Sequence, residues 1–198
     1  MRYHEIIKED AAVDGLMSYW DLVDHFGLKD AADKLHDASL PWINRNAPAA
    51  ITRLAANKKM RLLCKLNLFC TLEGPRNYSQ AWATPEMFEQ SLHKPVTMWR
   101  GGGGVYDPDH AYSLPWTSFT VKEGRAQTFS KYDGTRATRT FSLPLRDQYW
   151  IVKLVLPLDS ILLYLPHGSD EEVIVSVEDA RKAEVVVQTE KGMRDAVS

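Results

Sequence analysis

The spacing of apolar residues changes at Lys94-Pro95, and this change limits the folds that the chain can adopt. Before it, apolar residues such as Leu16, Trp20 and Val23 recur at helical spacing. After it, short β-rich runs follow one another with turn residues between them. No long helix separates these runs, which argues against a parallel doubly wound sheet. The sequence therefore predicts an α+β fold, with a helical lobe over residues 1–94 and a β-rich core over residues 95–198 in one compact unit.

Local signals place the expected elements. Gly27 ends the first helix, Pro48 is tolerated in the first turn of the third, and Thr84 is a helix N-cap before Pro85. Helices are expected over 14–26, 29–37, 46–57, 60–72, after Thr84, and over 122–130. Strands are expected over 96–100, 116–121, 138–143, 149–156, 161–165, 172–177 and 184–188, with a loop over 101–112. The strands are expected to form a mixed or antiparallel sheet system with the helices to one side.

Charge and composition restrict the partners. The 198-residue chain has a formal net charge of −2, which gives no overall attraction to nucleic acid or to an anionic membrane. The first ten residues are polar and charged, and no run approaches the length of about 18 apolar residues that a membrane span needs. Cys64 and Cys70 are the only cysteines and have no metal-ligand spacing, which favours a reducing compartment. We therefore expect a cytoplasmic protein with no membrane partner.

Neither a metal site nor a familiar nucleophile is indicated. The six histidines show no HxxxH or HxH spacing, so no metal ligand set is predicted. The sequence also lacks the G-x-S-x-G elbow and a cysteine-nucleophile signature. Any chemistry must therefore depend on other polar residues.

Two expected strands carry a cation and a pair of hydroxyls. Arg100 ends an apolar strand, so its guanidinium can bind a phosphate through two parallel hydrogen bonds. Gly101 follows it directly and lets the backbone approach a ligand closely. Ser118 and Thr120 lie two residues apart on the next strand and therefore face the same side. Taken alone, these segments also fit a flexible glycine-rich loop and an ordinary strand.

A third expected strand begins with carboxylates. Asp170 and Glu172 alternate with Glu171 at the entry to an apolar run, so they can face one way. Such a pair can divide its work, with one carboxylate stabilising developing positive charge and the other acting as a base. A charged loop end is the alternative interpretation.

In this order, the segments resemble the ADP-ribosyltransferases of the Arg–Ser–Glu class, which includes bacterial toxins, bacteriophage enzymes and arginine-specific animal ectoenzymes. Members show a strand ending in Arg-Gly, an aromatic-x-Ser-x-Ser/Thr strand, an Ala-x-x-Phe helix, and Glu/Gln-x-Glu before Val-Leu/Ile. The matching segments here are residues 98–101, 116–120, 126–129 and 170–174. The resemblance covers about residues 96–177, under half of the chain.

The resemblance implies a two-sheet, NAD-binding core and a mono-ADP-ribosyltransferase. Such an enzyme cleaves the nicotinamide–ribose bond of NAD, its co-substrate, and needs no metal. It transfers ADP-ribose to a macromolecular acceptor, here most favourably a protein arginine. A phage-encoded protein or an effector would act in the host cytosol.

The resemblance also implies a role for each matching residue. Glu172 would hydrogen-bond the ribose 2′-hydroxyl and stabilise the cationic sugar, while Ser118 holds Glu172 in place. Thr120 would support the strand, and Arg100 would bind the diphosphate. The backbone of Gly101 would hold the nicotinamide amide.

Further residues are implied around this centre. Phe129 or Phe141 would stack on the nicotinamide ring, and Arg136 or Arg139 would reach a phosphate. Asp170 would orient or deprotonate the acceptor nucleophile. The chain departs from the family here, because the first acid of the last motif is usually Glu or Gln. Aspartate keeps the charge but shortens the reach, which puts arginine specificity in doubt.

Other functions remain compatible with the same residues. An NAD glycohydrolase would use water as the acceptor and release free ADP-ribose. A third variation transfers ADP-ribose to a nucleic acid, which the basic residues of the helical half favour and the mildly acidic pI opposes. A catalytically inactive binding fold would need a broken triad, and Arg100, Ser118 and Glu172 are all present.

Overall fold

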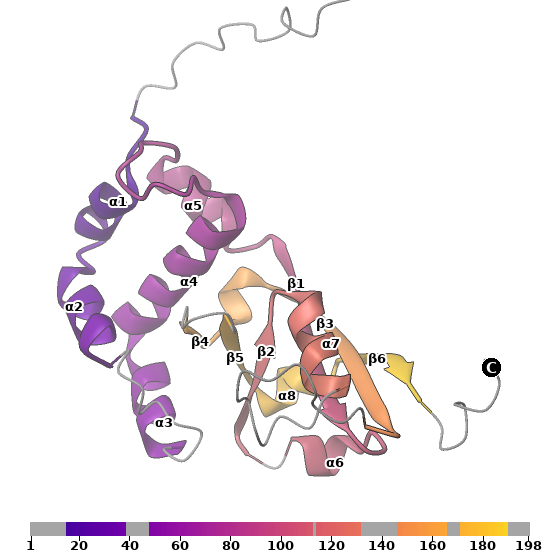
Figure 1. The fold of residues 1–198 in the computed structure, drawn as a ribbon. Helices are drawn as coiled ribbons and strands as arrows, with labels where there is room; N and C mark the ends of the chain where they lie inside the picture. Colours follow the sequence, from indigo (N-terminus) through magenta and orange to yellow (C-terminus); the bar gives the residue numbers. More distant parts are fainter. Residues whose placement is uncertain (1–14, 39–47, 113, 132–145, 166–170, 190–198) are drawn as a thin grey trace, which may run out of the picture.

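The computed structural model describes residues 15–38, 48–112, 114–131, 146–165 and 171–189. A helical lobe lies beside a β-sheet that carries three short helices (Figure 1). The lobe contains α1 (Tyr19–His25), α2 (Lys29–Ala38), α3 (Pro48–Ala56), α4 (Lys58–Glu73) and α5 (Pro85–Ser91). The described part of the chain is therefore an α+β fold in which the helices precede the sheet, as the sequence predicts.

The first helix begins later than residue 14. Ser18 is its N-cap: its hydroxyl accepts a hydrogen bond from the Asp21 N–H at 3.3 Å, and Asp21 Oδ2 accepts one from the Ser18 N–H at 2.9 Å. Just before it, Met17 pairs with Ala83 in an isolated β-bridge. This reciprocal cap fixes the start of α1, so the described residues just before it, 15–18, are not part of the helix.

Two other helix starts follow the sequence signals. Pro48 is the first residue of α3, as expected for a proline whose missing N–H would have no helical partner. The Thr84 hydroxyl accepts a hydrogen bond from the Met87 N–H at 3.3 Å and caps α5. Both predictions are confirmed.

The sheet has six strands in the described residues, and every neighbouring pair is antiparallel. The strands are β1 (Pro95–Gly103), β2 (Trp116–Thr120), β3 (Tyr149–Pro157), β4 (Leu163–Leu165), β5 (Glu172–Ser176) and β6 (Glu184–Gln188), in the spatial order β4-β5-β2-β1-β3-β6. The short helices α6 (Pro108–Ala111), α7 (Glu123–Lys131) and α8 (Val177–Ala180) follow β1, β2 and β5. The expected second sheet is not seen among the described strands, and the strand expected over 138–143 lies outside them.

The two edges of β1 differ in how many residues pair with the neighbouring strand. Along one edge, β1 pairs with β3 from Pro95 opposite Pro157 to Gly103 opposite Tyr149. Along the other, it pairs with β2 only where Trp99 lies opposite Thr120. The two central strands therefore separate after residue 99, and the sheet has an opening between them.

Glycines 101–103 belong to β1, whereas the sequence analysis expected them in a loop. A Cβ at Gly101 would overlap the carbonyl oxygen of Ala126 in α7, and one at Gly102 would overlap the ring of Trp150. Glycine is therefore needed here for close packing within a strand rather than for a flexible loop.

The helical lobe and the sheet share one apolar core. Leu63 and Phe69 of α4 belong to the same buried cluster as Leu156 of β3 and Tyr164 of β4. The Tyr164 hydroxyl donates a hydrogen bond to Thr71 Oγ1 at 3.1 Å, and burial raises the pKa of Tyr164 to about 12. These contacts fix α4 against one end of the sheet.

An ion pair joins the same two parts. Lys65 of α4 is buried and donates a hydrogen bond to Asp159, in the turn after β3. This hydrogen bond is the main reason that the pKa of Asp159 is lowered. The pair satisfies a lysine that would otherwise be buried without a counter-charge.

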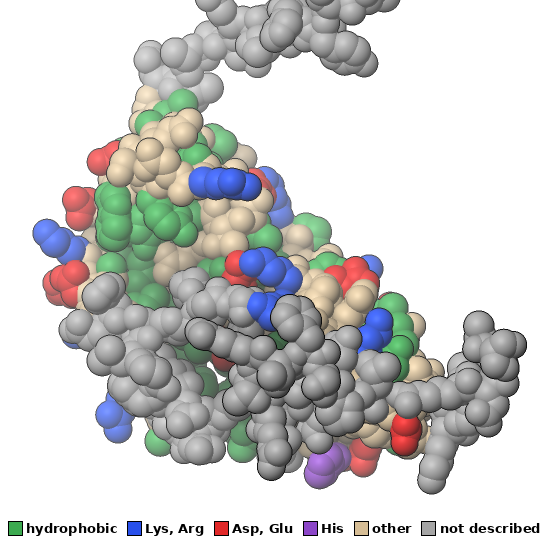
Figure 2. All heavy atoms as spheres, in the orientation of Figure 1, with side chains coloured by type: hydrophobic (Ala, Val, Ile, Leu, Met, Phe, Trp, Pro, Cys, Tyr) green, Lys and Arg blue, Asp and Glu red, His purple; other side chains and the backbone are tan. Residues whose placement is uncertain are grey.

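The surface carries both signs of charge. On the face shown in Figure 2, acidic side chains lie interspersed with lysines and arginines over the described residues. None of the described helices combines the length and the apolar character that spanning a membrane requires.

Candidate active site

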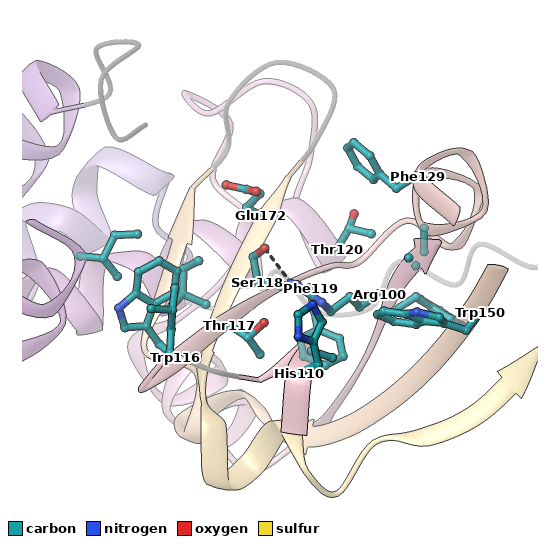
Figure 3. Close-up of a pocket in the computed structure, with 18 of the residues that line it drawn as sticks. Arg100, His110, Trp116, Thr117, Ser118, Phe119, Thr120, Phe129, Trp150 and Glu172 are labelled. Atoms are coloured by element: carbon teal, nitrogen blue, oxygen red, sulfur yellow. Dashed lines mark hydrogen bonds between the residues drawn. The ribbon is translucent and has the colours of Figure 1, made fainter. Parts of the chain in front are cut away.

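The opening between β1 and β2 leads into a cavity of about 650 Å³. It is lined by Ile51, Trp99, Arg100, Gly101, Gly102, His110, Ala111, Leu114, Trp116, Thr117, Ser118, Phe119, Thr120, Ala126, Phe129, Arg146, Trp150, Glu172 and Ile174. Six residues singled out by the sequence are among them: Arg100, Gly101, Ser118, Thr120, Phe129 and Glu172. The structure thus brings together side chains from β1, β2, α7 and β5 (Figure 3).

Arg100 connects the two strands where their backbones no longer pair. Its Nη1 donates to the Ser118 carbonyl oxygen at 2.7 Å and lies 3.3 Å from the Ser118 hydroxyl oxygen. A backbone carbonyl away from water needs a hydrogen-bond donor, and here the guanidinium supplies one in place of a β1 N–H. Arg100 therefore holds the opening in a defined shape and keeps a positive charge inside the cavity.

Ser118 and Glu172 come from paired strands and face the same cavity. Glu172 lies directly opposite Thr120 in the β2–β5 ladder, and Ser118 is two residues from Thr120 on the same face. The Ser118 and Glu172 positions are thus diagonal neighbours, about 7 Å apart in such a ladder. Figure 3 shows both side chains on the same side of the sheet, with Arg100 reaching toward Ser118. Glu172 is half-buried on a strand that has partners on both edges, β2 and β4, which gives it a rigid support.

Aromatic rings line the cavity at both ends. Phe129, from α7, and Trp150, from β3, lie on one side of Ser118, and Trp116 lies on the other (Figure 3). The Trp150 ring packs over Gly102, which is its partner across the β1–β3 ladder. Such surfaces suit planar groups of a ligand.

Trp150 is held in place by two tyrosines. Tyr106 meets it edge to face, with ring centroids 5.1 Å apart. The Tyr106 hydroxyl also donates a hydrogen bond to the Tyr112 hydroxyl at 3.2 Å. Burial is the main reason that the pKa of Tyr112 is raised, and the hydrogen bond with Tyr106 adds to this. Tyr112 therefore stays protonated and places no negative charge beside Tyr106.

Glu171, directly before Glu172, has an unusual backbone. Its φ of 44° is the only positive value of a non-glycine residue in the described part of the chain. Its Oε1 accepts a hydrogen bond from Lys122 Nζ, between β2 and α7. Residues in rare backbone conformations cluster at functional sites, where the surrounding structure holds them in place despite the strain.

Some predicted site residues cannot be located. Asp170, Arg136, Arg139 and Phe141 lie outside the described residues. Their proposed roles therefore stay predictions.

The lining residues that the sequence analysis did not assign to the site include Trp150, Arg146 and His110. Trp150 belongs to β3, Arg146 lies three residues before that strand, and His110 belongs to α6. Arg146 lies so close to Gly103 that a Cβ there would overlap its guanidinium. The run of glycines was the sequence signal that could have revealed these contacts, because glycines in a strand mark places where another group approaches the backbone closely.

The cavity resembles no metal centre in its described residues, which hold no group of three or more His, Cys, Asp or Glu side chains able to bind an ion. Comparisons of the whole chain with protein-family models, with curated proteins and with solved structures find no match. The cavity and the residues that line it are therefore the features of this protein that bear on its function.

Proposed function

We propose that the protein is an NAD-dependent mono-ADP-ribosyltransferase of the Arg–Ser–Glu type. The observation that carries this proposal is the convergence of Arg100, Ser118 and Glu172 on one cavity, from three different strands. These three side chains are separated by up to 72 residues in sequence, since they occupy positions 100, 118 and 172. A guanidinium, a hydroxyl and a carboxylate in one cleft match the chemistry of this reaction.

The described residues fit NAD as a substrate. The volume of about 650 Å³ lies within the usual range of small-molecule sites, about 300 to 1,000 Å³. Arg100 supplies positive charge for the anionic diphosphate, and the rings of Phe129 and Trp150 suit a pyridine. NAD supplies a nicotinamide–ribose bond whose cleavage develops positive charge on the ribose.

Glu172 would stabilise the positive charge that develops on the ribose. A carboxylate fixed on a paired strand stabilises positive charge that develops beside it, and it needs no reorganisation when the reaction occurs. Ser118, the diagonal neighbour of Glu172, would keep that carboxylate in its orientation. Arg100, already braced against Ser118, would bind phosphate oxygens while holding the β1–β2 opening in shape.

The acceptor follows from a smaller set of observations. The resemblance associates a glutamate two residues before the catalytic glutamate with arginine acceptors, and Asp170, which keeps that charge with a shorter reach, occupies the place in the sequence. We therefore propose a protein arginine as the acceptor. Water is the alternative acceptor, and the enzyme would then be an NAD glycohydrolase.

One assay separates these possibilities. The purified protein is incubated with NAD labelled in its adenine part and with cell lysate, with and without nuclease, and released nicotinamide is measured in parallel. We expect nicotinamide release and nuclease-resistant label on protein, which hydroxylamine removes if arginine is modified. Label lost on nuclease treatment would indicate a nucleic acid acceptor, and free ADP-ribose without labelled macromolecule would indicate a glycohydrolase. Absence of nicotinamide release from every mixture would refute the proposed function.

A further inference from the structure

The residue before Glu172 is fixed by a closed chain of contacts. Glu172 lies opposite Thr120 in the β2–β5 ladder. Thr120 Oγ1 accepts a hydrogen bond from the Lys122 N–H at 3.1 Å, and the Lys122 Nζ donates to Oε1 of Glu171. Glu171 is covalently joined to Glu172, so these contacts form a closed ring that begins and ends at Glu172. Each link restrains the others, although Lys122 and Glu171 lie 49 residues apart in sequence.

The backbone of Glu171 needs such a restraint. Its φ of 44° lies in the left-handed region, which a side chain with a Cβ disfavours. Without an anchor, the chain would relax toward an ordinary extended or helical conformation. Because Glu171 and Glu172 share a peptide bond and Glu172 is the first residue of β5, that relaxation would strain the first pairs of this strand and shift the Glu172 side chain relative to Ser118.

The Glu171 side chain is more buried than the lysine that binds it. Its side chain is 16% exposed, whereas that of Lys122 is 52% exposed. The other carboxylate oxygen, Oε2, is buried and has no hydrogen-bond partner in the described structure. A buried carboxylate oxygen without a donor is costly, so Lys122 is the main compensation for placing Glu171 there.

We propose that Lys122 and Glu171 are positioning residues for Glu172. Lys122 binds the Glu171 carboxylate, holds residue 171 in its left-handed conformation, and so directs the Glu172 carboxylate to the cavity beside Ser118 and Arg100. This role rests on the proposed function, since it gives Glu172 its orientation for NAD cleavage. Neither Lys122 nor Glu171 contacts the cavity, and neither is assigned to substrate binding.

The test compares two ion pairs of similar exposure. Lys122→Met removes the proposed anchor. Lys182→Met is the matched control, because it breaks the Lys182–Asp179 pair of α8, whose side chains are 60% and 22% exposed. Lys122→Arg keeps the charge and should keep the anchor. For each protein, kcat and KM for nicotinamide release and the melting temperature are measured.

We expect Lys122→Met to lower kcat by about 10- to 100-fold, because small misplacements of a reacting group have effects of this size. KM should change by less than about twofold, since uniform substrate binding is untouched. The melting temperature should fall further in Lys122→Met than in Lys182→Met, because the less exposed Glu171 carboxylate loses its donor, so kcat is measured well below both melting temperatures. Lys122→Arg should recover most of kcat. The proposal is overturned if Lys122→Met and Lys182→Met have equal kcat, or if only KM rises.

A crystallographic comparison separates this proposal from the proposed function. In Lys122→Met, we expect residue 171 to leave the positive-φ region and the χ1 angle of Glu172 to change, relative to the unaltered protein. Unchanged geometry at both residues would overturn the positioning role even if the enzyme is active. Conversely, an unaltered protein that releases no nicotinamide would refute the proposed function, while the two crystal structures would still decide whether Lys122 sets the geometry.

Discussion

Within the helical lobe, Phe88 packs against Phe26 and Phe69 with ring centroids 5.3 Å and 5.6 Å apart, in an interior that excludes water. Between β1 and β2, by contrast, the strands separate and Arg100 bridges the opening with its guanidinium. The first region uses apolar area to stabilise the fold. The second places polar groups around a cavity instead of closing it. This contrast predicts that stability and the proposed chemistry depend on different residues, so that substitutions should affect one without the other.

The largest effect on stability is expected in the helical lobe. Phe88→Ala should lower the free energy of unfolding by about 3 to 5 kcal/mol, because it removes a fully buried ring and leaves a cavity. Urea denaturation measures this loss. Met87→Ala, at the exposed neighbouring position, is the control and should change stability by less than about 0.5 kcal/mol. If the folded fraction of Phe88→Ala also loses NAD cleavage, the two regions are not separable.

The largest effect on activity is expected at the cavity. Glu172→Gln should lower kcat/KM for nicotinamide release by about 100-fold or more, which corresponds to about 3 kcal/mol of lost charge stabilisation. The melting temperature should stay close to that of the unaltered protein. Glu184→Gln, which neutralises an exposed carboxylate at the start of β6, serves as the control. Full activity in Glu172→Gln would contradict the proposal that Glu172 stabilises the developing positive charge.

A smaller effect on both properties is expected at the glycine run. Gly102→Ala forces the Trp150 ring to move, because the added Cβ would overlap it, and should cost about 1 to 3 kcal/mol of stability. The same shift of a cavity wall should raise KM for NAD. Gly124→Ala is the matched control: a Cβ there meets nothing within 4 Å, so it should be neutral or slightly stabilising in the α7 helix. Equal behaviour of the two variants would show that Gly102 has no packing role.

The smallest effect is expected at the ion pair between the two regions. The Lys65 hydrogen bond lowers the pKa of Asp159 in the folded protein, so the pair stabilises the fold above the unfolded-state pKa, and this contribution is lost as pH falls through the lowered value. Asp159→Asn should therefore cost about 1 kcal/mol at pH 7, because the carboxylate is 60% exposed and an amide oxygen in its place can still accept a hydrogen bond from the buried Lys65. Urea denaturation at pH 7 and pH 3 measures the difference. If Asp159→Asn and the unaltered protein differ in unfolding free energy by the same amount at both pH values, the pH dependence assigned to this ion pair is wrong.

The sequence predicted the elements well where the signal was local. The Thr84 cap, the Pro48 start and the β-rich runs from β1 to β6 need only neighbouring residues to be recognised. The start of α1 was misplaced although its signal was present, since Ser18 and Asp21 are spaced as a capping box.

Sequence motifs pointed to only part of the candidate site. Arg100, Ser118 and Glu172 lie within such motifs, and the structure brings all three to one cavity. Trp150 and Arg146 were missed because they reach the cavity through the β1–β3 pairing, which no local pattern reveals. The extension of β1 through Gly103 was missed for the same reason: contacts with α7 and β3 decide it, and glycine alone predicts a loop.

Three of the six tryptophans of the chain, Trp99, Trp116 and Trp150, line the cavity from three different strands. Indole emission responds to changes in polarity and to nearby rings, so a molecule that enters this space should alter the intrinsic fluorescence of the protein. Removing one indole at a time would then map which end of the cavity a bound molecule occupies. The protein therefore carries its own optical reporter of occupancy, which allows ligands to be screened before any catalytic assay is established.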